Sequence, residues 1–444
     1  MEILEEALAM LEKHPLCDNC LGRQFALLGY GVENAERGKT VKLVLAFKAH
    51  ELELSKNKDG VRILKILAEN GLHEMTKQML QKMKKHVATS EPAKECFLCR
   101  NRLKEVENLA KKAVKLLEDY EYRSFLVGIE LPTEVEERED EFKAEFEIDR
   151  GESLRNEFGR LIGKQIAKHT GKEVEFSKPE VVVLANPFTG KVTLQVNPLF
   201  VAGRYRKLVR DIPQSRWFCS DCRGRGCKKC NWTGKMYPES VEEIVEKPFL
   251  EVTRGIKASF HASGREDIDA RMLGRGRPFV VEITRPVKRF FDLKSIEEAV
   301  NVYGKNKVKI SGLKFADKST VRKLKKAEST QKEYRLTIEF ENAIADKDMR
   351  LLEDRLTRCV IEQRTPKRVL HRRADLTREK YIYDVKVKKM SSRKAEMRVR
   401  CQGGLYVKEL VTGDDGRTAP SVSEILGNQA KPLKLDVLNI IMKE

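Results

Sequence analysis

The chain lacks any run of about eighteen apolar residues, and its first residues lack the basic-then-apolar pattern of a secretory signal. It has no Gly-x-x-x-x-Gly-Lys-Ser phosphate loop and no glycine-rich strand-to-helix turn for a dinucleotide. It also has no fixed-period repeat and no low-complexity tract. These absences predict a cytoplasmic protein with no membrane partner and no organic cofactor, and they argue against an ATP-driven enzyme.

Acidic residues are too few to balance the basic ones. The 444 residues include 87 Lys and Arg against 68 Asp and Glu, a formal net charge of +19. About half of that excess lies between residues 350 and 400, where 17 basic residues stand beside 7 acidic ones. A charged, solvated surface explains the abundance of charge but not this imbalance, which predicts an acidic partner, most simply a nucleic acid. The length suggests about three domains.

Disulfides are not expected, because eight of the ten cysteines form Cys-x-x-Cys pairs in a chain with the character of an intracellular protein. Cys219, Cys222, Cys227 and Cys230 offer four thiolates within twelve residues, which suits tetrahedral zinc.

A second pair of Cys-x-x-Cys units, Cys17/Cys20 and Cys96/Cys99, is split by a long helical segment. Long insertions between ligand pairs add little loop entropy, so the two units could form a second zinc site. The alternative is two unrelated pairs of reduced thiols. About two zinc ions are therefore expected, both structural, because four thiolates leave no open position for a substrate.

Hydrophobic periodicity divides the chain into regions of different type. It predicts a helical zinc-binding region over 1–100, an α+β unit over 101–215, a cysteine- and glycine-rich knuckle over 216–238, and a second domain over 239–444. The fold class is therefore α+β and multidomain.

The stretch 264–274 places Asp267 and Asp269 between two apolar segments that read as strands. Nearby Arg265 and Arg271 would keep a carboxylate on this turn ionised, as nucleophilic or base chemistry on a polyanion requires. An ordinary surface turn with local ion pairs explains the same residues if the rest of the chain is ignored.

Three longer motifs carry a resemblance to a known family. They are residues 203–214, which lead to Trp217 and the knuckle, residues 260–279 around the Gly-Arg-Glu-Asp turn, and residues 365–374. Taken in this order over nearly the whole chain, they resemble the archaeal Pus ten family, the tRNA pseudouridine synthases that act on the TΨC arm.

The resemblance implies a THUMP-containing RNA-binding module before the knuckle and a mixed-sheet pseudouridine synthase domain after it. It implies isomerisation of uridines 54 and 55 of tRNA without an organic cofactor. It also implies that the N-terminal half binds the tRNA, at the acceptor stem, with Arg204, Arg206, Lys207 and Arg210 at its exit. We expect a monomer.

The family's motifs also imply roles for residues. Asp267, rather than Asp269, matches the catalytic aspartate; Tyr383, with Tyr381 the poorer fit, matches the tyrosine that packs on the target base. Lys408 stands where other branches have an arginine that partners the aspartate. The surrounding basic residues are expected to bind substrate phosphates: Arg265, Arg271, Arg368, His371, Arg372 and Arg373.

Three other functions share some of these features. A non-catalytic zinc-containing RNA-binding protein would need no reactive Asp267. A THUMP-containing methyltransferase or thiolase would need the nucleotide-type cofactor loop that the chain lacks. A zinc-domain chaperone would need the knuckle to be repeated, and it occurs once.

Overall fold

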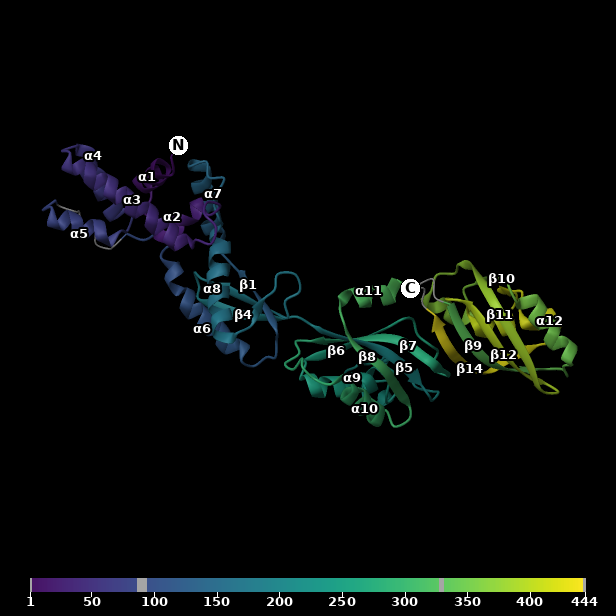
Figure 1. Ribbon diagram of the computed structural model, residues 1–444. Coiled ribbons are helices and arrows are strands. Elements are labelled where there is room, and N and C mark those ends of the chain that lie inside the picture. The colour runs from purple at the N-terminus through teal and green to yellow at the C-terminus, as the bar shows by residue number, and fades with distance from the viewer. Residues whose placement is uncertain (1, 86–93, 327–330, 442–444) are drawn as a thin grey trace. The chain divides into compact units, whose positions relative to one another are not determined.

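The computed structural model describes residues 2–85, 94–326 and 331–441. The chain forms two compact units, residues 1–197 and 198–444, which are described separately (Figure 1). Among the described residues, no helix is long and apolar enough to cross a membrane.

The first unit begins with helices. The apolar face of α1 buries Ala7, Met10 and Leu11, as its periodicity predicts. Residues 58–82 form two helices, α4 and α5, and the mostly acidic residues 133–145 form α7. The helices and their bounds are α1 (Ile3–Lys13), α2 (Asp18–Gly22), α3 (Asn34–Leu54), α4 (Lys58–Glu69), α5 (Glu74–Lys82), α6 (Val106–Leu117), α7 (Thr133–Glu145) and α8 (Leu154–Thr170), with short 3-10 turns η1 (Arg23–Phe25) and η2 (Arg102–Glu105).

Helices α2 and α3 approach each other closely because glycines lie at their contact. A Cβ atom on Gly22 would lie 1.9 Å from the Asn34 carbonyl oxygen, so no larger residue fits there. The fully buried Lys42 donates from α3 to the Leu16 carbonyl and to Asp18 Oδ1, at 2.9 and 2.6 Å. These contacts fix the backbone on either side of Cys17.

A four-stranded sheet completes the first unit. Its order is β2-β1-β3-β4. Strand β1 is parallel to both β2 and β3, whereas β4 is antiparallel to β3. Helix α8 lies against β1, and α6 lies against α8 and β4. The strands are β1 (Ser124–Ile129), β2 (Glu173–Val174), β3 (Val181–Asn186) and β4 (Lys191–Val196).

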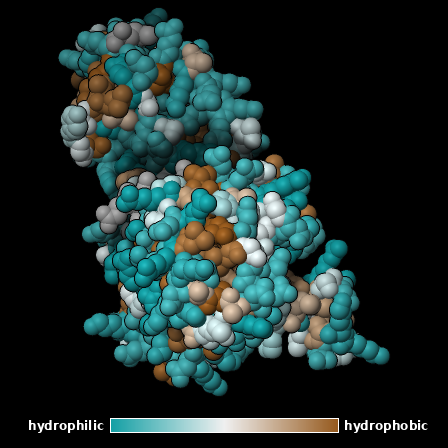
Figure 2. All heavy atoms as spheres, turned by 90° about the vertical axis from the view of Figure 1, so that its right-hand side faces the viewer, coloured by the Kyte–Doolittle hydropathy of each residue, from teal (hydrophilic) through white to brown (hydrophobic). Residues whose placement is uncertain are grey.

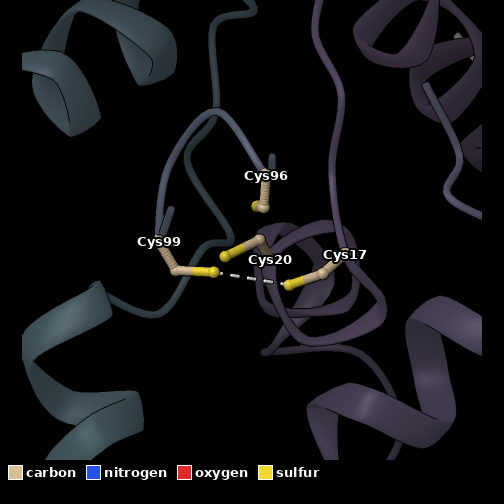
Figure 3. A group of neighbouring side chains, drawn as sticks. All are labelled: Cys17, Cys20, Cys96 and Cys99. Carbon is tan, nitrogen blue, oxygen red and sulfur yellow. Dashed lines mark hydrogen bonds between the residues drawn. The ribbon is translucent and has the colours of Figure 1, made fainter. Parts of the chain in front are cut away.

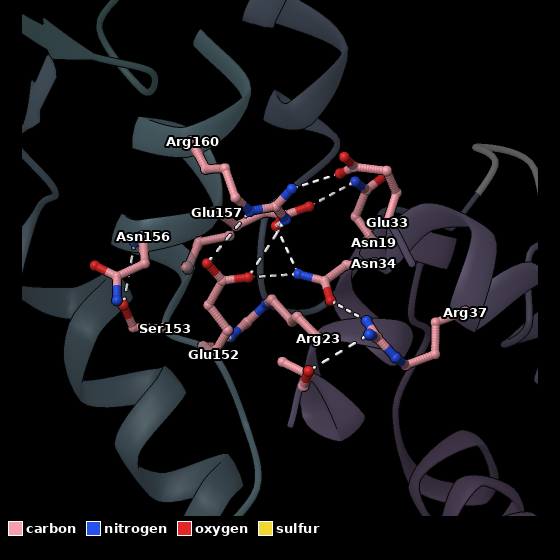
Figure 4. Close-up of polar contacts among 12 residues, drawn as sticks. Asn19, Arg23, Glu33, Asn34, Arg37, Glu152, Ser153, Asn156, Glu157 and Arg160 are labelled. Atoms are coloured by element: carbon pink, nitrogen blue, oxygen red, sulfur yellow. Dashed lines mark hydrogen bonds and ion pairs between the residues drawn. The ribbon is translucent and has the colours of Figure 1, made fainter. Parts of the chain in front are cut away.

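A charged cluster joins the helical region to the sheet region of this unit (Figure 4). Asn34 Nδ2 donates to Glu152 and Glu157 at 2.6 and 2.7 Å, and Arg160 pairs with Glu33, Glu152 and Glu157. One hydrophobic core also runs through both regions. The regions expected as separate domains over 1–100 and 101–215 are thus parts of one unit.

The second unit contains a ten-stranded mixed sheet with the order β13-β10-β11-β12-β9-β14-β7-β5-β8, and β6 pairs with β7. Strands β14 and β7 are parallel, and the other pairs are antiparallel. The strands are β5 (Leu199–Lys207), β6 (Lys257–Ala262), β7 (Ala270–Thr284), β8 (Val308–Ala316), β9 (Gln331–Phe340), β10 (Val360–Arg364), β11 (Thr377–Ser391), β12 (Lys394–Gln402), β13 (Thr418–Ala419) and β14 (Ala430–Ile441).

Strand β5 corrects the expected domain boundary. We expected residues up to 215 in the RNA-binding unit, but β5 pairs with β7 and β8, and the units divide between Asn197 and Pro198. The alternation of β5 predicts a strand without saying which sheet it joins.

Helices and short turns surround this sheet. Helix α9 contacts β6 and β7, and α12 contacts β11. The remaining elements are α9 (Val241–Thr253), α10 (Leu293–Tyr303), α11 (Lys318–Lys326), α12 (Asp346–Leu356), α13 (Val407–Thr412), α14 (Val422–Leu426), η3 (Lys228–Cys230) and η4 (Lys367–Arg372).

Candidate active site and metal centres

The turn that carries Asp267 connects β6 to β7, as the two apolar segments predicted. Next to it in sequence, Glu266 is buried and accepts hydrogen bonds from the Tyr205 hydroxyl and from Arg277 Nε, both at 2.9 Å. Arg277 Nη1 also donates to the Ser263 carbonyl at 2.7 Å. A buried carboxylate is stable only when it is paired and hydrogen-bonded. These bonds therefore fix the backbone of the turn next to Asp267.

A lysine fixes the other end of the same turn. Lys207 Nζ donates to the backbone carbonyls of Asp267 and Ile268 at 3.2 and 2.9 Å, and to that of Ile212 at 2.8 Å. Burial lowers the pKa of Lys207 to about 8. This finding corrects the expectation that Lys207 forms part of an RNA-binding exit surface, because its side chain is inside the protein.

The segment that follows β5 also contacts the turn. Gln214 Nε2 donates to the Gly264 carbonyl at 2.9 Å, and Arg210 Nη1 donates to the Asp269 carbonyl at 2.7 Å. Arg210 also pairs with Asp436 at 2.6 Å, so it is committed to protein contacts. The function of this segment in the structure is to hold the turn.

Two cations contact the Asp267 carboxylate, whose side chain is 38% exposed. Lys408 Nζ lies 3.2 Å from Asp267 Oδ2, and Arg368 Nη1 lies 3.4 Å from the same atom. Lys408 belongs to α13 and Arg368 to η4, both distant in sequence from the turn. Arg368 Nε also donates to the buried Glu409 at 2.6 Å, which orients the guanidinium toward the turn. The structure therefore brings Asp267, Lys408 and Arg368 together.

Asp269 shares the same lysine. Lys408 Nζ lies 2.8 Å from each Asp269 carboxylate oxygen. Burial tends to raise the pKa of Asp269, but the hydrogen bond and charge of Lys408 outweigh it, so the pKa is lower than usual. Asp269 is the more exposed of the two carboxylates, at 61%.

The flanking arginines behave differently from the sequence expectation. Arg271 donates two hydrogen bonds of 2.9 Å to Asp436, which lies on β14. Arg265 is exposed on the turn. The cations that contact Asp267 come instead from η4 and α13. Nothing in the local sequence of the turn indicates this, since Lys408 and Arg368 reach it only through the fold.

Tyr381 and Tyr383 lie side by side on β11, with ring centroids 5.1 Å apart and nearly perpendicular planes. A bulge in the pairing of β11 with β12 falls at Tyr383, and both rings are half-buried. Such bulges re-aim side chains next to functional sites. Within the described part of the chain, neither ring makes a hydrogen bond or a ring contact with the turn.

The basic stretch beyond β10 is partly neutralised. Arg364 pairs with Asp375 at 2.7 Å and Lys367 with Asp415 at 2.5 Å. His371 and Arg373 are exposed, and the side chain of Arg372 lies outside the described residues. The face seen in Figure 2, which looks onto the α12 end of the second unit, is mostly hydrophilic around a hydrophobic patch.

A second concentration of positive charge lies on the sheet itself. Lys386, Arg398 and Arg335 occupy directly paired positions on β11, β12 and β9. Arg335 is paired with Asp436 at 2.9 Å and Arg398 with Glu396 at 3.4 Å, so neighbouring acidic groups offset two of these three charges.

Comparison with known proteins accounts for most of the chain. Residues 200–441 match the family model described as Pus10, C-terminal, and residues 109–186 match the Pus10 THUMP domain, archaeal. This chain belongs to the Pus10 family. A tRNA pseudouridine synthase Pus10 of Methanocaldococcus jannaschii is 45% identical over 99% of this chain and 94% of the relative. The relative of the same name from Pyrococcus furiosus is 38% identical over 99% and 98%.

Membership in the Pus10 family of tRNA pseudouridine synthases confirms the resemblance, and the mixed sheets and THUMP match confirm the expected α+β, multidomain class.

The split cysteine pairs of this Pus10 chain come together in the first unit (Figure 3). The four sulfur atoms of Cys17, Cys20, Cys96 and Cys99 lie within 4.8 Å of one another, which confirms that the two pairs form one group. The Phe97 amide donates to the Pro15 carbonyl at 2.7 Å and holds the second pair beside the first. A four-sulfur group of this size fits a structural metal ion.

The knuckle forms the second group, again with its sulfurs within 4.8 Å of one another. Backbone amides of Gly226 and Gly234 donate to the sulfurs of Cys222 and Cys230, both at 3.2 Å. Burial raises the pKa of Cys230, but amide donors and the neighbouring thiols outweigh it and bring the pKa to about 6. Thiolates held by amide donors are the form that binds a metal.

Proposed function

We propose that this chain isomerises uridine to pseudouridine at positions 54 and 55 of the TΨC loop of tRNA, with Asp267 as the reacting carboxylate. The observation that carries the proposal is the Asp267 carboxylate itself, which is half-exposed, contacted by Lys408 and Arg368, and held on a turn fixed by buried groups. The relatives' printed name, tRNA pseudouridine synthase, supports the reaction.

The chemistry asks little of a cofactor. The bond between uracil N1 and the ribose carbon breaks, a bond from uracil C5 to that carbon forms, and the C5 proton is lost while N1 gains one. Substrate and product have the same atoms, so no oxidant, reductant or organic cofactor is consumed. The target uridine must leave the base stack, because its reacting atoms are hidden within the folded loop.

The residues of the site divide this work. Asp267 must be ionised to react, and Lys408 and Arg368 place two positive charges beside its carboxylate. Tyr383, with Tyr381 beside it, offers a ring on which the flipped base can pack. Arg265, His371, Arg372 and Arg373 are proposed to bind the flanking RNA backbone. Arg271 is left out of this set, because its guanidinium is bound to Asp436.

The decisive experiment incubates an unmodified tRNA transcript with the protein and no cofactor, then maps pseudouridine at each position. We expect product at 54 and 55. Asp267→Asn should lower the rate by about 10³-fold or more, the order seen when a reacting group is removed. Its tRNA affinity should change little, because phosphate contacts supply most of the affinity.

Asp269→Asn is the matched control, because Asp269 shares Lys408 but is the more exposed carboxylate. It should keep most of the activity. Full activity in Asp267→Asn would overturn the role of Asp267, and loss only in Asp269→Asn would move that role to Asp269. Tight tRNA binding with no product in the wild-type protein would favour the non-catalytic alternative.

We also propose that both four-cysteine groups hold zinc. Metal analysis should give about two zinc ions per chain. Cys17→Ser should lower this to about one, and Cys401→Ser, which removes a buried cysteine outside both groups, should leave it at two. A content of one that Cys17→Ser does not change would overturn the split site.

The first unit is proposed to bind the acceptor stem of the tRNA. The THUMP match over residues 109–186 supports this division of labour, because a pocket for one flipped uridine contacts only that nucleotide and its neighbours. Shortening the acceptor stem of the transcript should raise KM and leave kcat unchanged. An unchanged KM would exclude the acceptor stem. A catalytic fragment would have to begin near Pro198, not near Glu239, because β5 and Lys207 hold the turn.

A further inference from the structure

The knuckle shows two aromatic rings to the solvent. Phe218 is 58% exposed and Trp232 is 72% exposed, although they lie next to the cysteine group. The buried residues beneath them are the cysteines themselves, so the knuckle has no apolar core that these rings could join. The Phe218 ring lies against Gly224, where a Cβ would meet it at 3.0 Å, so Trp232 is the ring more available to a partner.

The backbone holds Trp232 in this exposed position. Its φ of +63° lies in the left-handed region, which bulky residues rarely adopt. The Trp232 amide donates to the Cys227 carbonyl at 2.9 Å, and a Cβ on Gly226 would lie 2.8 Å from the Trp232 carbonyl oxygen. Strain that persists because surrounding contacts enforce it is concentrated at functional sites.

The knuckle also carries cations with no acidic partner among the described residues, one of which, Arg225, donates Nε to the Cys222 carbonyl at 3.3 Å. Arg223, Arg225 and Lys228 are exposed and form no ion pair with the described acidic groups, whereas Lys229 pairs with Asp221 at 2.8 Å. An exposed aromatic ring among free cations is the combination with which proteins bind single-stranded nucleic acid: the ring stacks on a base and the cations contact its phosphates. A protein partner with an apolar surface would leave these charges desolvated and unpaired.

The knuckle is also connected to the candidate active site by a short segment. Gln214 contacts the turn through the Gly264 carbonyl, and Phe218 follows four residues later. Four residues span at most about 14 Å when fully extended. An RNA strand that leaves the active site can therefore reach the knuckle.

We propose that the knuckle is a second tRNA-binding site of this chain, in which Trp232 stacks on an unpaired base other than the target uridine while Arg223, Arg225 and Lys228 contact the adjacent phosphates. The inference rests on the proposed tRNA substrate. It assigns to the knuckle a role in substrate binding in addition to a structural metal.

The chain has only two tryptophans, which allows a direct test. In a full-length Trp217→Phe protein, Trp232 is the sole tryptophan, and Phe preserves the ring that Trp217 packs against Tyr237. Titration with the tRNA transcript should change Trp232 emission with the same Kd as binding measured by filter retention. Two RNA probes of equal length, one single-stranded and one a blunt duplex, are then compared. The single-stranded RNA should change Trp232 emission more than the duplex does. Unchanged emission at saturating tRNA would overturn the proposal.

A set of variants measures the contribution to the reaction. Trp232→Gly removes the ring and relieves the positive φ, so zinc content and thermal stability should be maintained. Its KM for tRNA should rise at least about fivefold, the lower end of the effect of losing one stacked base, with kcat within twofold. Trp232→Phe should restore most of the affinity. Met390→Ala, which removes another side chain that is 58% exposed, should have no effect.

The two proposals fail in different ways. If wild-type protein forms pseudouridine and Trp232→Gly leaves both KM and the salt dependence of binding unchanged, the knuckle site is overturned and the activity stands. If tRNA changes Trp232 emission but no pseudouridine forms, the activity is overturned and the knuckle site is supported.

Discussion

Two charged clusters of this chain differ in whether their carboxylates are buried or exposed to solvent. In the first unit, Glu157 is fully buried between Arg160, Asn19 and Asn34, and burial raises its pKa (Figure 4). In the second unit, Asp267 and Asp269 extend from a buried base into partly exposed positions beside Lys408. The first cluster uses its charges to join two regions of one fold. The second keeps a carboxylate accessible, which a reaction requires.

The largest expected effect tests the buried cluster. Arg160→Met should destabilise the first unit by about 3 kcal/mol, because it leaves Glu157 buried without its ion-pair partner. The rate at saturating tRNA should stay within about twofold, since the cluster contains no reacting group. Denaturant unfolding and single-turnover assays measure the two quantities. Loss of turnover in a fully folded variant would contradict the distinction between the clusters.

A substitution of similar size in the second cluster should have the opposite result. Lys408→Met should lower the rate about 10²-fold, as expected when one preorganised charge is removed from a reacting group. Stability should change by less than about 1 kcal/mol, because Lys408 and both aspartates are partly exposed. Lys408→Arg should keep much of the activity, since it preserves the charge. A Lys408→Met protein that is active but unfolds early would reverse the assignment.

A third test uses pH and the ion pairs that Asp436 forms with Arg210, Arg271 and Arg335. Burial raises the pKa of Asp436, but hydrogen bonds from Arg271 and Arg335 outweigh it and lower the pKa to about 2. Its contribution, roughly 2 to 3 kcal/mol for such a shift, is complete above about pH 4 and is lost as pH falls toward 2. Asp436→Asn should therefore flatten the acid limb of the stability profile. An unchanged dependence of stability on pH would show that these ion pairs make no net contribution to the free energy of unfolding.

Sequence alone could predict the parts of the site that are local. The turn around Asp267 and the two cysteine groups follow from short motifs between recognisable segments, and the cysteine groups are confirmed. The partners could not be predicted in the same way. Glu266 and Lys207 are charged residues that the fold buries, and a pattern search assigns charged residues to the surface. Their burial depends on the pairing of β5 with β7, which local alternation leaves open.

The same limit explains the arginines. Arg271 lies four residues from Asp267 in sequence but binds Asp436 on β14, whereas Arg368 comes from η4 to contact Asp267. Charge neighbours on a strand are set by the adjacent strand and not by the adjacent residue. In the sequence, only the family resemblance connects Lys408 with Asp267.

The smallest expected effect shows whether burial or the number of ion pairs determines stability in the first cluster. Glu33 pairs with both Arg160 and Lys164, and the hydrogen bond from Lys164 lowers its pKa, yet its side chain is 42% exposed. Solvent screens such pairs, so Glu33→Gln should cost no more than about 1 kcal/mol despite removing two of them. Arg160→Met should cost about three times as much, because one of its partners, Glu157, is inaccessible to water. Arg160→Met removes three ion pairs and Glu33→Gln removes two, so costs in about that ratio, measured by denaturant unfolding at low and high salt, would show that the number of ion pairs decides. A Glu33→Gln effect that disappears in high salt, beside an Arg160→Met effect that persists, would assign the stability to the buried carboxylate.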